Sequence, residues 1–217
     1  MIQFENVTAK YADDAGVFDL SFHIDKGEMV FLMGPTGAGK STVLKIIYKD
    51  ILLSDGSLYI DNKDISYMPS RKIPYYRRRI GMIFQDFRLI QDRTVFENVA
   101  LPLHISGFSR KIIKSKVFEI LDKVGLGSVS QMIPSQLSGG EQQRVSIARA
   151  LVKEPVVILA DEPTGNLDPN VSDEILDLLE LATDNGTSVL MSTHNFPLIR
   201  PRKKRYIELN NGRLVQK

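Results

Sequence analysis

Residues 34–42 have side-chain types and a spacing that could hold a chain of phosphates. They fit the pattern G-x-x-x-x-G-K-[ST], in which glycines let the backbone curl and point its N–H groups at an anion. Lys40 can reach the outer phosphates of a nucleotide, and the hydroxyl of Ser41 suits Mg²⁺. The predicted nucleotide-binding residues of this loop are Gly34, Pro35, Thr36, Gly37, Ala38, Gly39, Lys40, Ser41 and Thr42.

The segments around this loop distinguish a phosphate site from a chance glycine-rich turn. Residues 29–33 form a short apolar run that is typical of a buried strand, and residues 42–47 have the composition of a helix. A strand, a glycine loop and a helix whose positive dipole end faces the loop favour the phosphate site.

Two carboxylates follow a second buried run. Residues 156–160 are apolar, and Asp161 and Glu162 come directly after them. A carboxylate at the end of a strand can hold Mg²⁺, and a second one can act on an attacking water as a general base. Many buried strands end in an acid, so this pair is specific only in combination with the loop at residues 34–42.

Residues 137–142 read Leu-Ser-Gly-Gly-Glu-Gln and allow two interpretations. Ser138 and Glu141 have the spacing of a capping box, which predicts the start of a helix. This leaves Gly139 and Gly140 unexplained, because each glycine in a first helical turn costs about 1 kcal/mol. Close approach of the backbone to an anion would account for both glycines.

The composition of the 217-residue chain indicates one globular domain, with or without a subdomain. The chain has no cysteine, which excludes disulfides and thiolate metal sites. No apolar run approaches the ~18–20 residues of a membrane span. The first residues lack a signal-peptide pattern. We therefore expect a cytoplasmic protein.

The net charge of +2 does not indicate a nucleic-acid-binding protein. Two segments are nevertheless locally basic, residues 71–79 and residues 200–205. Each is either a solvated face or a surface that lies near anionic lipid or an acidic partner. The sequence leaves this choice open.

The order of apolar patterns along the chain predicts an α/β fold. Residues 18–24 alternate between apolar and polar, as in a half-buried antiparallel strand. Helical spacing dominates from about residue 86 to 150, and another helix is expected to begin after Asp168 as its cap. Asn211 and Gly212 predict a hairpin turn. Three short apolar runs read as strands covered on both faces, as in a parallel sheet: residues 80–84, 156–160 and 188–192.

Together these motifs resemble those of the ABC-type ATPases over essentially the whole chain. The LSGGEQ segment resembles the signature sequence of that family. Tyr11 occupies the place of an adenine-stacking aromatic ring, and Gln85 that of the Q-loop glutamine. Asp168 lies in a segment that resembles the D-loop, and His194 matches the switch histidine. Taken alone, Tyr11 reads as a surface aromatic and His194 as an ordinary polar residue at a strand end.

The resemblance implies an α/β P-loop NTPase of the ABC type, with a mixed core sheet, an antiparallel β subdomain and an inserted α-helical subdomain. It implies a single ATPase domain over residues 1–217. A RecA-like core with the antiparallel β subdomain would take about residues 1–85 and 151–217. The helical signature subdomain would take about residues 86–150.

The resemblance also implies ATP and Mg²⁺ as the bound groups and a homodimer in the ATP-bound state. Members of this family place each ATP between the phosphate loop of one copy and the signature segment of the other. The implied metal residues are Ser41, Gln85 and Asp161. The implied catalytic residues are Glu162, His194, Gln85 and Lys40. The partner-bound ATP would be contacted by Ser138, Gly139, Gly140 and Glu141, while Asp168 would couple the two sites.

Residues 162–168 resemble a bacterial branch that contains lipoprotein-release, macrolide-export and cell-division ATPases, and residues 92–94 favour the cell-division members. Residues 48–51 and Asn195 depart from the usual pattern. The resemblance implies an ATPase, peripheral on the inner face of the membrane, that acts on an FtsX-like integral membrane partner through a groove near Gln85–Asn98. It would regulate peptidoglycan hydrolysis indirectly; lipoprotein release or export is the alternative.

Other classes of function fit the sequence less well. A DNA-repair ABC protein needs a long coiled coil between its nucleotide motifs, and residues 43–136 are too short and lack sustained heptads. The ribosomal type usually carries two cassettes. A nucleotide-dependent scaffold is disfavoured because all residues for hydrolysis are present. We expect no nucleic-acid partner.

Overall fold

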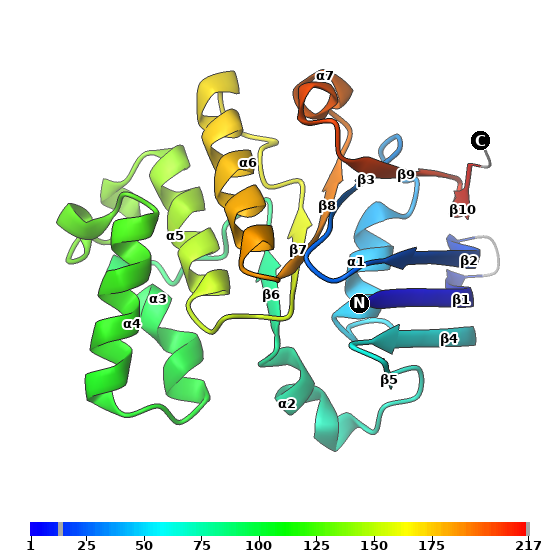
Figure 1. The fold of residues 1–217 in the computed structure, drawn as a ribbon, viewed down its shortest axis with the longest axis horizontal. Coiled ribbons are helices and arrows are strands. Elements are labelled where there is room, and N and C mark those ends of the chain that lie inside the picture. The colour runs from blue at the N-terminus through cyan, green and yellow to red at the C-terminus, as the bar shows by residue number, and fades with distance from the viewer. Residues whose placement is uncertain (13–14, 216–217) are drawn as a thin grey trace.

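The computed structural model describes residues 1–12 and 15–215, which form two sheets and the helices around them (Figure 1). The strands are β1 Ile2–Ala12, β2 Ala15–Ile24, β3 Met29–Met33, β4 Asp55–Ile60, β5 Lys63–Asp64, β6 Ile80–Ile83, β7 Val157–Asp161, β8 Ser188–Thr193, β9 Arg205–Asn210 and β10 Arg213–Leu214. The α-helices are α1 Lys40–Ile47, α2 Ile73–Arg77, α3 Val95–Ile105, α4 Arg110–Lys123, α5 Gly139–Leu151, α6 Pro169–Asp184 and α7 Phe196–Ile199. Short 3-10 turns are η1 Ser70–Lys72, η2 Gly127–Val129, η3 Pro134–Gln136 and η4 Arg200–Arg202.

The first sheet is antiparallel, with the strand order β2-β1-β4-β5. The alternation of residues 18–24 predicts β2, and no sequence pattern predicts β1. The inward-facing residues of β1 change from Ile2 and Phe4 to Val7 and Ala9, because the register shifts between Phe4 and Val7. Asn6, at this irregularity, has a φ of 51°. A bulge breaks the period of two on which strand prediction depends.

The second sheet has the order β10-β9-β3-β8-β7-β6 and is parallel except for β10, which forms the expected hairpin with β9. It is thus the mixed sheet predicted from the sequence. Its central strands are buried on both faces, since alternate residues enter two different hydrophobic clusters. In β3, for example, Val30 and Leu32 face one cluster, while Met29 and Phe31 face the other.

Helix α1 packs between the two sheets, because Val43, Leu44, Ile46 and Ile47 share a cluster with residues of both. Helix α6 covers the other face of the parallel sheet, where it meets the carboxyl-terminal part of α5. Helices α3, α4 and α5 pack around a third cluster of their own, at the left of Figure 1. Among the described residues, no helix is both long enough and apolar enough to cross a membrane.

Local signals start and end the helices that carry the motifs. Ser138 and Glu141 form a reciprocal capping box at the start of α5, as predicted. The Asp168 carboxylate accepts the N–H groups of Asn170 and Val171, both at 3.1 Å, and so caps α6. Gly125 follows α4 with a φ of 72°, a left-handed conformation that glycine adopts without strain.

Candidate functional site

The carboxyl ends of four neighbouring parallel strands meet at one edge of the second sheet. The phosphate loop follows β3, His194 follows β8, Glu162 follows β7, and Gln85 comes shortly after β6. The register pairs Met33 with Thr193 and Asp161 with Ser192, so these strand ends lie level with one another. Residues that are far apart in the sequence are therefore gathered at the edge where ligands bind in open α/β sheets.

A cavity of about 860 Å³ opens at this edge. Most of the sequence-predicted nucleotide residues line it: Tyr11, Thr36, Gly37, Gly39, Lys40, Ser41, Thr42, Gln85, Asp161, Glu162 and His194. The sequence did not predict the part of its wall that comes from the two hairpins, namely Ala15, Gly16, Phe18, Asn211 and Gly212. A hairpin contributes to a site only through tertiary packing, and no local pattern reports such packing.

Glycines allow the backbone conformation of the phosphate loop, and the side chain of Lys40 bonds back to carbonyl oxygens of the same loop. A Cβ on Gly34 would lie 2.3 Å from the carbonyl oxygen of Leu209, so no larger residue fits there. Gly39, with a φ of 101°, precedes α1 and gives this helix no side-chain cap. Lys40 is 5% exposed, and its Nζ donates to the carbonyl oxygens of Gly34 at 2.8 Å and Pro35 at 3.1 Å. An uncapped helix start beside a lysine is an anion-binding arrangement.

Glu162 lies at the centre of the site. One of its carboxylate oxygens is 3.5 Å from Nζ of Lys40, and the other is 3.0 Å from Nδ1 of His194. Its backbone has a φ of 44°, and its N–H donates to the hydroxyl of Ser192 at 3.0 Å. A glutamate held in the left-handed region is strained, and such strain is concentrated at functional positions. The carboxylate is thus fixed between Lys40 and His194.

Asp161 forms the oxygen-rich side of the site. Its Oδ1 accepts the hydroxyls of Ser41 at 3.0 Å and Ser192 at 2.7 Å. A carboxylate and a hydroxyl are ligands that Mg²⁺ prefers, and Mg²⁺ is commonly held by only one or two protein groups. The donor set of Ser41 and Asp161, with the Gln85 amide in the same cavity, fits the predicted magnesium site. Ser192 was missed by the sequence prediction, although it lies two residues before His194.

Tyr11 lines the cavity from the antiparallel sheet and is 54% exposed. Its hydroxyl is hydrogen-bonded to the hydroxyl of Thr42, the second residue after the loop lysine. This contact connects the exposed Tyr11 side chain to α1, the helix that follows the phosphate loop.

The signature segment lies elsewhere. Ser138, Gly139, Gly140 and Glu141 are absent from the described lining of the cavity, and so is Asp168. Ser138 and Gly139 are exposed at the amino-terminal end of α5. Hydrogen bonds from the side chain and the backbone N–H of Ser138 lower the pKa of the Glu141 carboxyl, so Glu141 is ionised at neutral pH. One copy of the chain therefore contains both halves of the predicted site but does not bring them together.

Gly140 has a packing role that the sequence analysis did not identify. A Cβ at this position would lie 2.8 Å from a methyl carbon of Val171 on α6, which is closer than real side chains approach. Gly139 differs, because a Cβ there would meet only a Leu167 methyl carbon at an ordinary 3.7 Å. The helix contact thus accounts for Gly140, while Gly139 remains free for the predicted anion contact.

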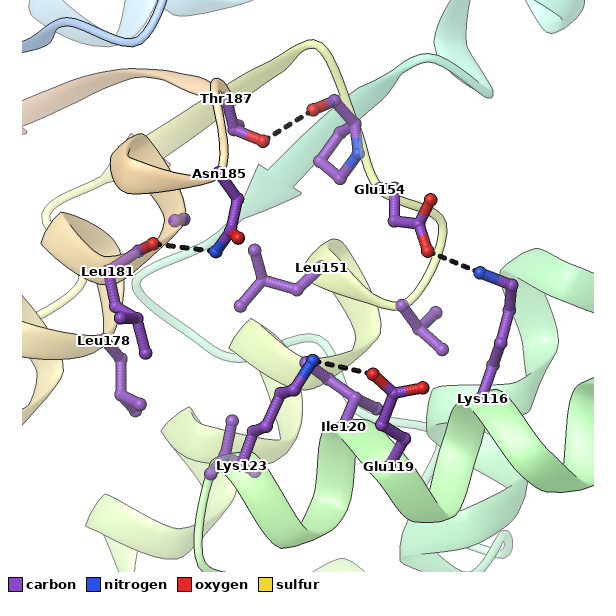
Figure 2. Close-up of a pocket in the computed structure, with 14 residues that line it drawn as sticks. Lys116, Glu119, Ile120, Lys123, Leu151, Glu154, Leu178, Leu181, Asn185 and Thr187 are labelled. Atoms are coloured by element: carbon purple, nitrogen blue, oxygen red, sulfur yellow. Dashed lines mark hydrogen bonds and ion pairs between the residues drawn. The ribbon is translucent and has the colours of Figure 1, made fainter.

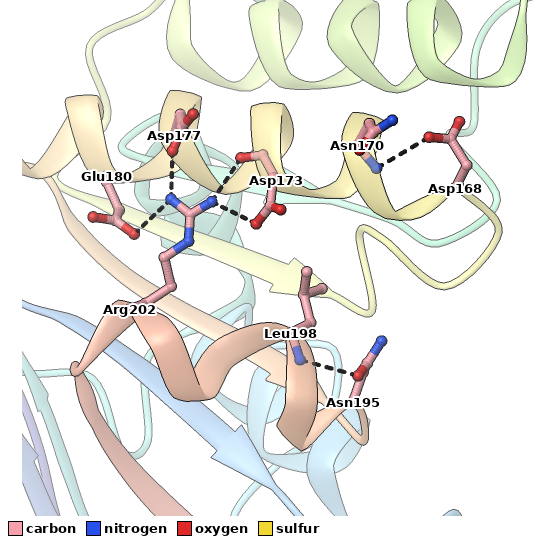
Figure 3. A network of polar contacts seen from close by, with 8 residues as sticks. All are labelled: Asp168, Asn170, Asp173, Asp177, Glu180, Asn195, Leu198 and Arg202. Carbon is pink, nitrogen blue, oxygen red and sulfur yellow. Dashed lines mark hydrogen bonds and ion pairs between the residues drawn. The ribbon is translucent and has the colours of Figure 1, made fainter.

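The segment after His194 is attached to α6, the helix that begins after Asp168 in the predicted D-loop (Figure 3). Asn195 caps α7 by accepting the N–H of Leu198 at 3.2 Å. Arg202, in η4, reaches across to α6 and donates to Asp173, Asp177 and Glu180. Burial opposes its charge, but the hydrogen bonds to Asp173 and Asp177 outweigh that cost and raise the pKa of Arg202. Three of the five basic residues in 200–205 are thereby engaged within the molecule, since Lys204 also pairs with Glu180 and Arg205 with Glu28.

A groove of about 240 Å³ lies between the parallel sheet and the helices α3 and α5. Its lining includes Phe84 and Arg88 after β6, Leu101 and Pro102 on α3, and Lys153 after α5. The sequence predicts a partner groove near Gln85–Asn98, and Arg88 of that range is among the described residues that line this groove. Asn98 is fully buried, and it holds the loop by accepting the N–H of Ile90 at 2.8 Å. Gln85 lines the nucleotide cavity instead.

Cations that the sequence prediction missed form one wall of this groove. Arg149 donates to the carbonyl oxygens of Phe87 at 2.7 Å and Arg88 at 2.6 Å, which fixes the loop after β6. Lys153 donates to the carbonyl oxygen of Arg77 at 3.0 Å. Burial lowers the pKa of Arg149, and it lowers that of Lys153 to about 8. A basic residue on a helix is usually exposed to solvent. The sequence analysis therefore identified neither Arg149 nor Lys153 as a groove residue.

Lys153 should make the stability of the protein depend on pH. Its pKa of about 8 in the folded state lies below its unfolded value of 10.5, so the unfolded chain binds more protons between these values. The free energy of unfolding should therefore rise from pH 8 toward pH 10 by roughly 2–3 kcal/mol from this residue. Urea unfolding of the wild-type chain and of Lys153→Met at both pH values measures the difference. Parallel pH profiles for the two proteins would contradict the prediction.

A second cavity, also of about 240 Å³, lies at the opposite edge of the parallel strands (Figure 2). Pro155 precedes β7 there, Thr187 precedes β8, and the Thr187 hydroxyl donates to the Pro155 carbonyl oxygen. Its walls are the apolar side chains of α4, α5 and α6, with the ion pairs Lys116–Glu154 and Lys123–Glu119 at the rim. It has neither the phosphate loop nor the acid pair, so the predicted chemistry belongs to the first cavity.

Comparison with known proteins identifies the family. Residues 17–165 match the ABC transporter family. The chain is 49% identical over 215 residues to the cell division ATP-binding protein FtsE of Escherichia coli K12, covering 99% of this chain and 97% of that protein. It is 45% identical over 217 residues to FtsE of Bacillus subtilis, covering 100% of this chain and 95% of that protein.

Solved structures agree with this match. The fold superposes with a TM-score of 0.89 on the ATP-binding cassette MJ0796, solved as a dimer in a post-hydrolysis state with ADP and phosphate, at 36% identity and covering 100% of this chain and 97% of that one. A second dimeric structure of the same cassette, described as a bacterial ABC transporter cassette, gives a TM-score of 0.88 at 37% identity, with the same coverage. The chain therefore belongs to the ABC transporter family of ATPases, among the FtsE-type cell-division ATP-binding proteins.

Proposed function

We propose that this FtsE-type ATPase converts the binding and hydrolysis of ATP between two copies of the chain into a movement of an FtsX-like integral membrane protein. Through that protein it would regulate peptidoglycan hydrolases during cell division. The observation that carries the proposal is the position of Glu162, which contacts both Lys40 of the phosphate loop and the switch residue His194. The full-length relatives named for cell division support the choice of process.

Within one copy, the phosphate loop and Lys40 bind the phosphates of ATP, and Tyr11 stacks on the adenine. Ser41, Asp161 and Gln85 would hold Mg²⁺, which would supply positive charge to neutralise the phosphate oxygens. Glu162 orients the attacking water and takes its proton, as general bases do when they lie within hydrogen-bond reach. His194 keeps the Glu162 carboxylate in position and contacts the γ-phosphate.

The second copy completes the site. Ser138, exposed at the start of α5, and the N–H groups of the first helical turn would contact the γ-phosphate of the ATP bound to the other copy. Glu141 fixes Ser138 by accepting its N–H at 2.8 Å. Asp168, at the start of the neighbouring helix α6, couples the two sites. ATP then holds two copies together, and loss of the γ-phosphate releases them.

The membrane partner would dock in the groove between β6, α3 and α5. Arg88 lines this groove, and Gln85, three residues earlier, lines the nucleotide cavity, so one short loop reaches both. We further propose that residues 86–150, with the hydrophobic cluster of α3, α4 and α5, move as a unit against the core when ATP binds. The ATPase would accordingly lie on the cytoplasmic face of the membrane, held there by its partner.

A pull-down from detergent-solubilised membranes tests the partner. Tagged Glu162→Gln chain with ATP should retain an FtsX-like protein, identified by mass spectrometry, and retain less of it with ADP. Recovery of a lipoprotein-release or efflux permease in its place would keep the ATPase mechanism and reject the division role. The same chain carrying Lys153→Glu, which reverses a charge inside the groove, should lose the partner.

A further inference from the structure

We propose that this chain has a second membrane contact of its own, a basic and aromatic patch around η1 and α2 that binds the headgroups of anionic lipids. The patch consists of Lys63, Tyr67, Arg71, Lys72, Tyr75 and Arg78, and it is called the α2 patch below. It contains part of the basic segment at residues 71–79, for which the sequence left open a solvated face or a functional surface. The proposal does not depend on the membrane partner.

The charge of the molecule is concentrated at this place. Residues 60–79 carry six cationic side chains and two carboxylates, a net charge of +4, whereas the whole chain has a net charge of +2. Within the described residues, the exposed side chains of Lys63, Arg71 and Lys72 have no carboxylate partner. A cluster of unpaired cations on one surface attracts an anionic bilayer.

The other basic segment serves as an internal contrast. In residues 200–205, three of the five cations are paired: Arg202 with three carboxylates of α6, Lys204 with Glu180 and Arg205 with Glu28. In residues 71–79, Arg77 and Arg79 are paired with Asp50 and Asp61. These two arginines fix α2 to the core, and the remaining cations of the segment are left for a ligand.

The patch also has the aromatic residues that membrane interfaces favour. Tyr67 is 71% exposed and Tyr75 is 66% exposed, on either side of a groove of about 620 Å³ whose lining is mostly apolar. Arg78 stacks over the ring of Tyr75, 4.9 Å from its centre, and its Nε has no hydrogen-bond partner in the described structure. Tyrosine rings lie at the headgroup level of bilayers, with their apolar part in the lipid and the hydroxyl in water.

The position of the patch agrees with a surface that faces the membrane. The carbonyl oxygen of Arg77 accepts a hydrogen bond from Nζ of Lys153, and the guanidinium of Arg77 stacks on the ring of Tyr48. Lys153 and Tyr48 both line the proposed partner groove. Tyr75, on the same short helix, lines the groove of the α2 patch. The α2 patch therefore adjoins the proposed partner groove, and its orientation toward the membrane, unlike its charge and exposure, rests on the proposed function.

Vesicle co-sedimentation of the full chain tests the proposal. The wild-type chain should bind vesicles in which about one third of the lipid is phosphatidylglycerol and should not bind pure phosphatidylcholine; about 0.5 M NaCl should release it. The double variant Arg71→Glu, Lys72→Glu should weaken binding at least about tenfold, since it reverses two charges at the bilayer surface. Tyr67→Ser with Tyr75→Ser should weaken it at unchanged charge.

A matched control separates this patch from the overall charge of the protein. Lys111 and Lys114 are exposed on α4 and unpaired among the described residues, so Lys111→Glu with Lys114→Glu makes the same change in charge at another place. The control should bind as the wild type does.

An equal loss in both double variants, or no preference for the anionic vesicles, would overturn the proposal. Binding to polyglutamate without binding to vesicles would assign the patch to an acidic protein and overturn it as well. Unchanged thermal unfolding of the variants shows that they are folded.

Discussion

Glu162→Gln should lower the rate of ATP hydrolysis at least about a hundredfold, because a carboxylate that acts as general base typically contributes 10²–10⁴-fold. The substitution keeps the size of the side chain and a hydrogen-bond acceptor for His194, which lies 3.0 Å from the carboxylate. It removes the negative charge that lies 3.5 Å from Lys40, so ATP binding should be retained or strengthened. The variant should then accumulate as an ATP-bound dimer, visible by size-exclusion chromatography.

His194→Ala provides the comparison for this result. If Glu162 acts on the water and His194 holds it in place, both variants lose turnover, but only Glu162→Gln retains the closed dimer. Turnover close to that of the wild type in Glu162→Gln would show that another group activates the water. If Glu162→Gln hydrolysed ATP at a near-normal rate and still formed a stable dimer, accumulation of the dimer could not be attributed to blocked hydrolysis.

Gly139→Asp should abolish hydrolysis without unfolding the protein or preventing one copy from binding ATP. A side chain fits at this exposed position, since its Cβ would meet only a Leu167 methyl carbon at 3.7 Å. An aspartate in the first turn of α5 is also favoured by the helix dipole. In the proposed dimer, however, the new carboxylate would lie against the γ-phosphate of the other copy. Fluorescent-nucleotide binding and phosphate release measure the two effects separately.

Ser135→Asp is the control for this variant, because it adds the same charge at an exposed position in the preceding turn η3. It should hydrolyse ATP at close to the wild-type rate. A Gly139→Asp chain with normal turnover would place the signature segment outside the working site.

Patterns that local sequence determines were predicted correctly. The buried strands β3, β7 and β8 contain short apolar runs, and their two faces enter separate hydrophobic clusters. Ser138 and Asp168 cap α5 and α6 as their spacing predicts. The phosphate loop requires glycine at position 34, because the carbonyl oxygen of Leu209 leaves no room for a Cβ there. A glycine with such a role can be recognised from the sequence motif alone.

Features that depend on which segments meet in space were not predictable in this way. Strand β1 was missed because a bulge near Asn6 shifts its inward-facing residues. The close packing of Gly140 on Val171 needs the contact between α5 and α6, and the hairpins that line the nucleotide cavity need both sheets. The sequence suggests that Arg149 and Lys153 are solvated cations, although the fold half-buries them in the wall of the groove between β6, α3 and α5.

The central claim is that two copies share each ATP site, and a mixing experiment tests it most directly. Lys40→Met damages the phosphate loop and Gly139→Asp damages the signature segment, so each variant alone should be inactive. In an equal mixture, half of the pairs contain both variants, and each such pair has one intact composite site. The account predicts that hydrolysis returns to about a quarter of the wild-type rate, from counting sites in random pairs. A mixture no more active than its separate components would contradict a site shared between two copies.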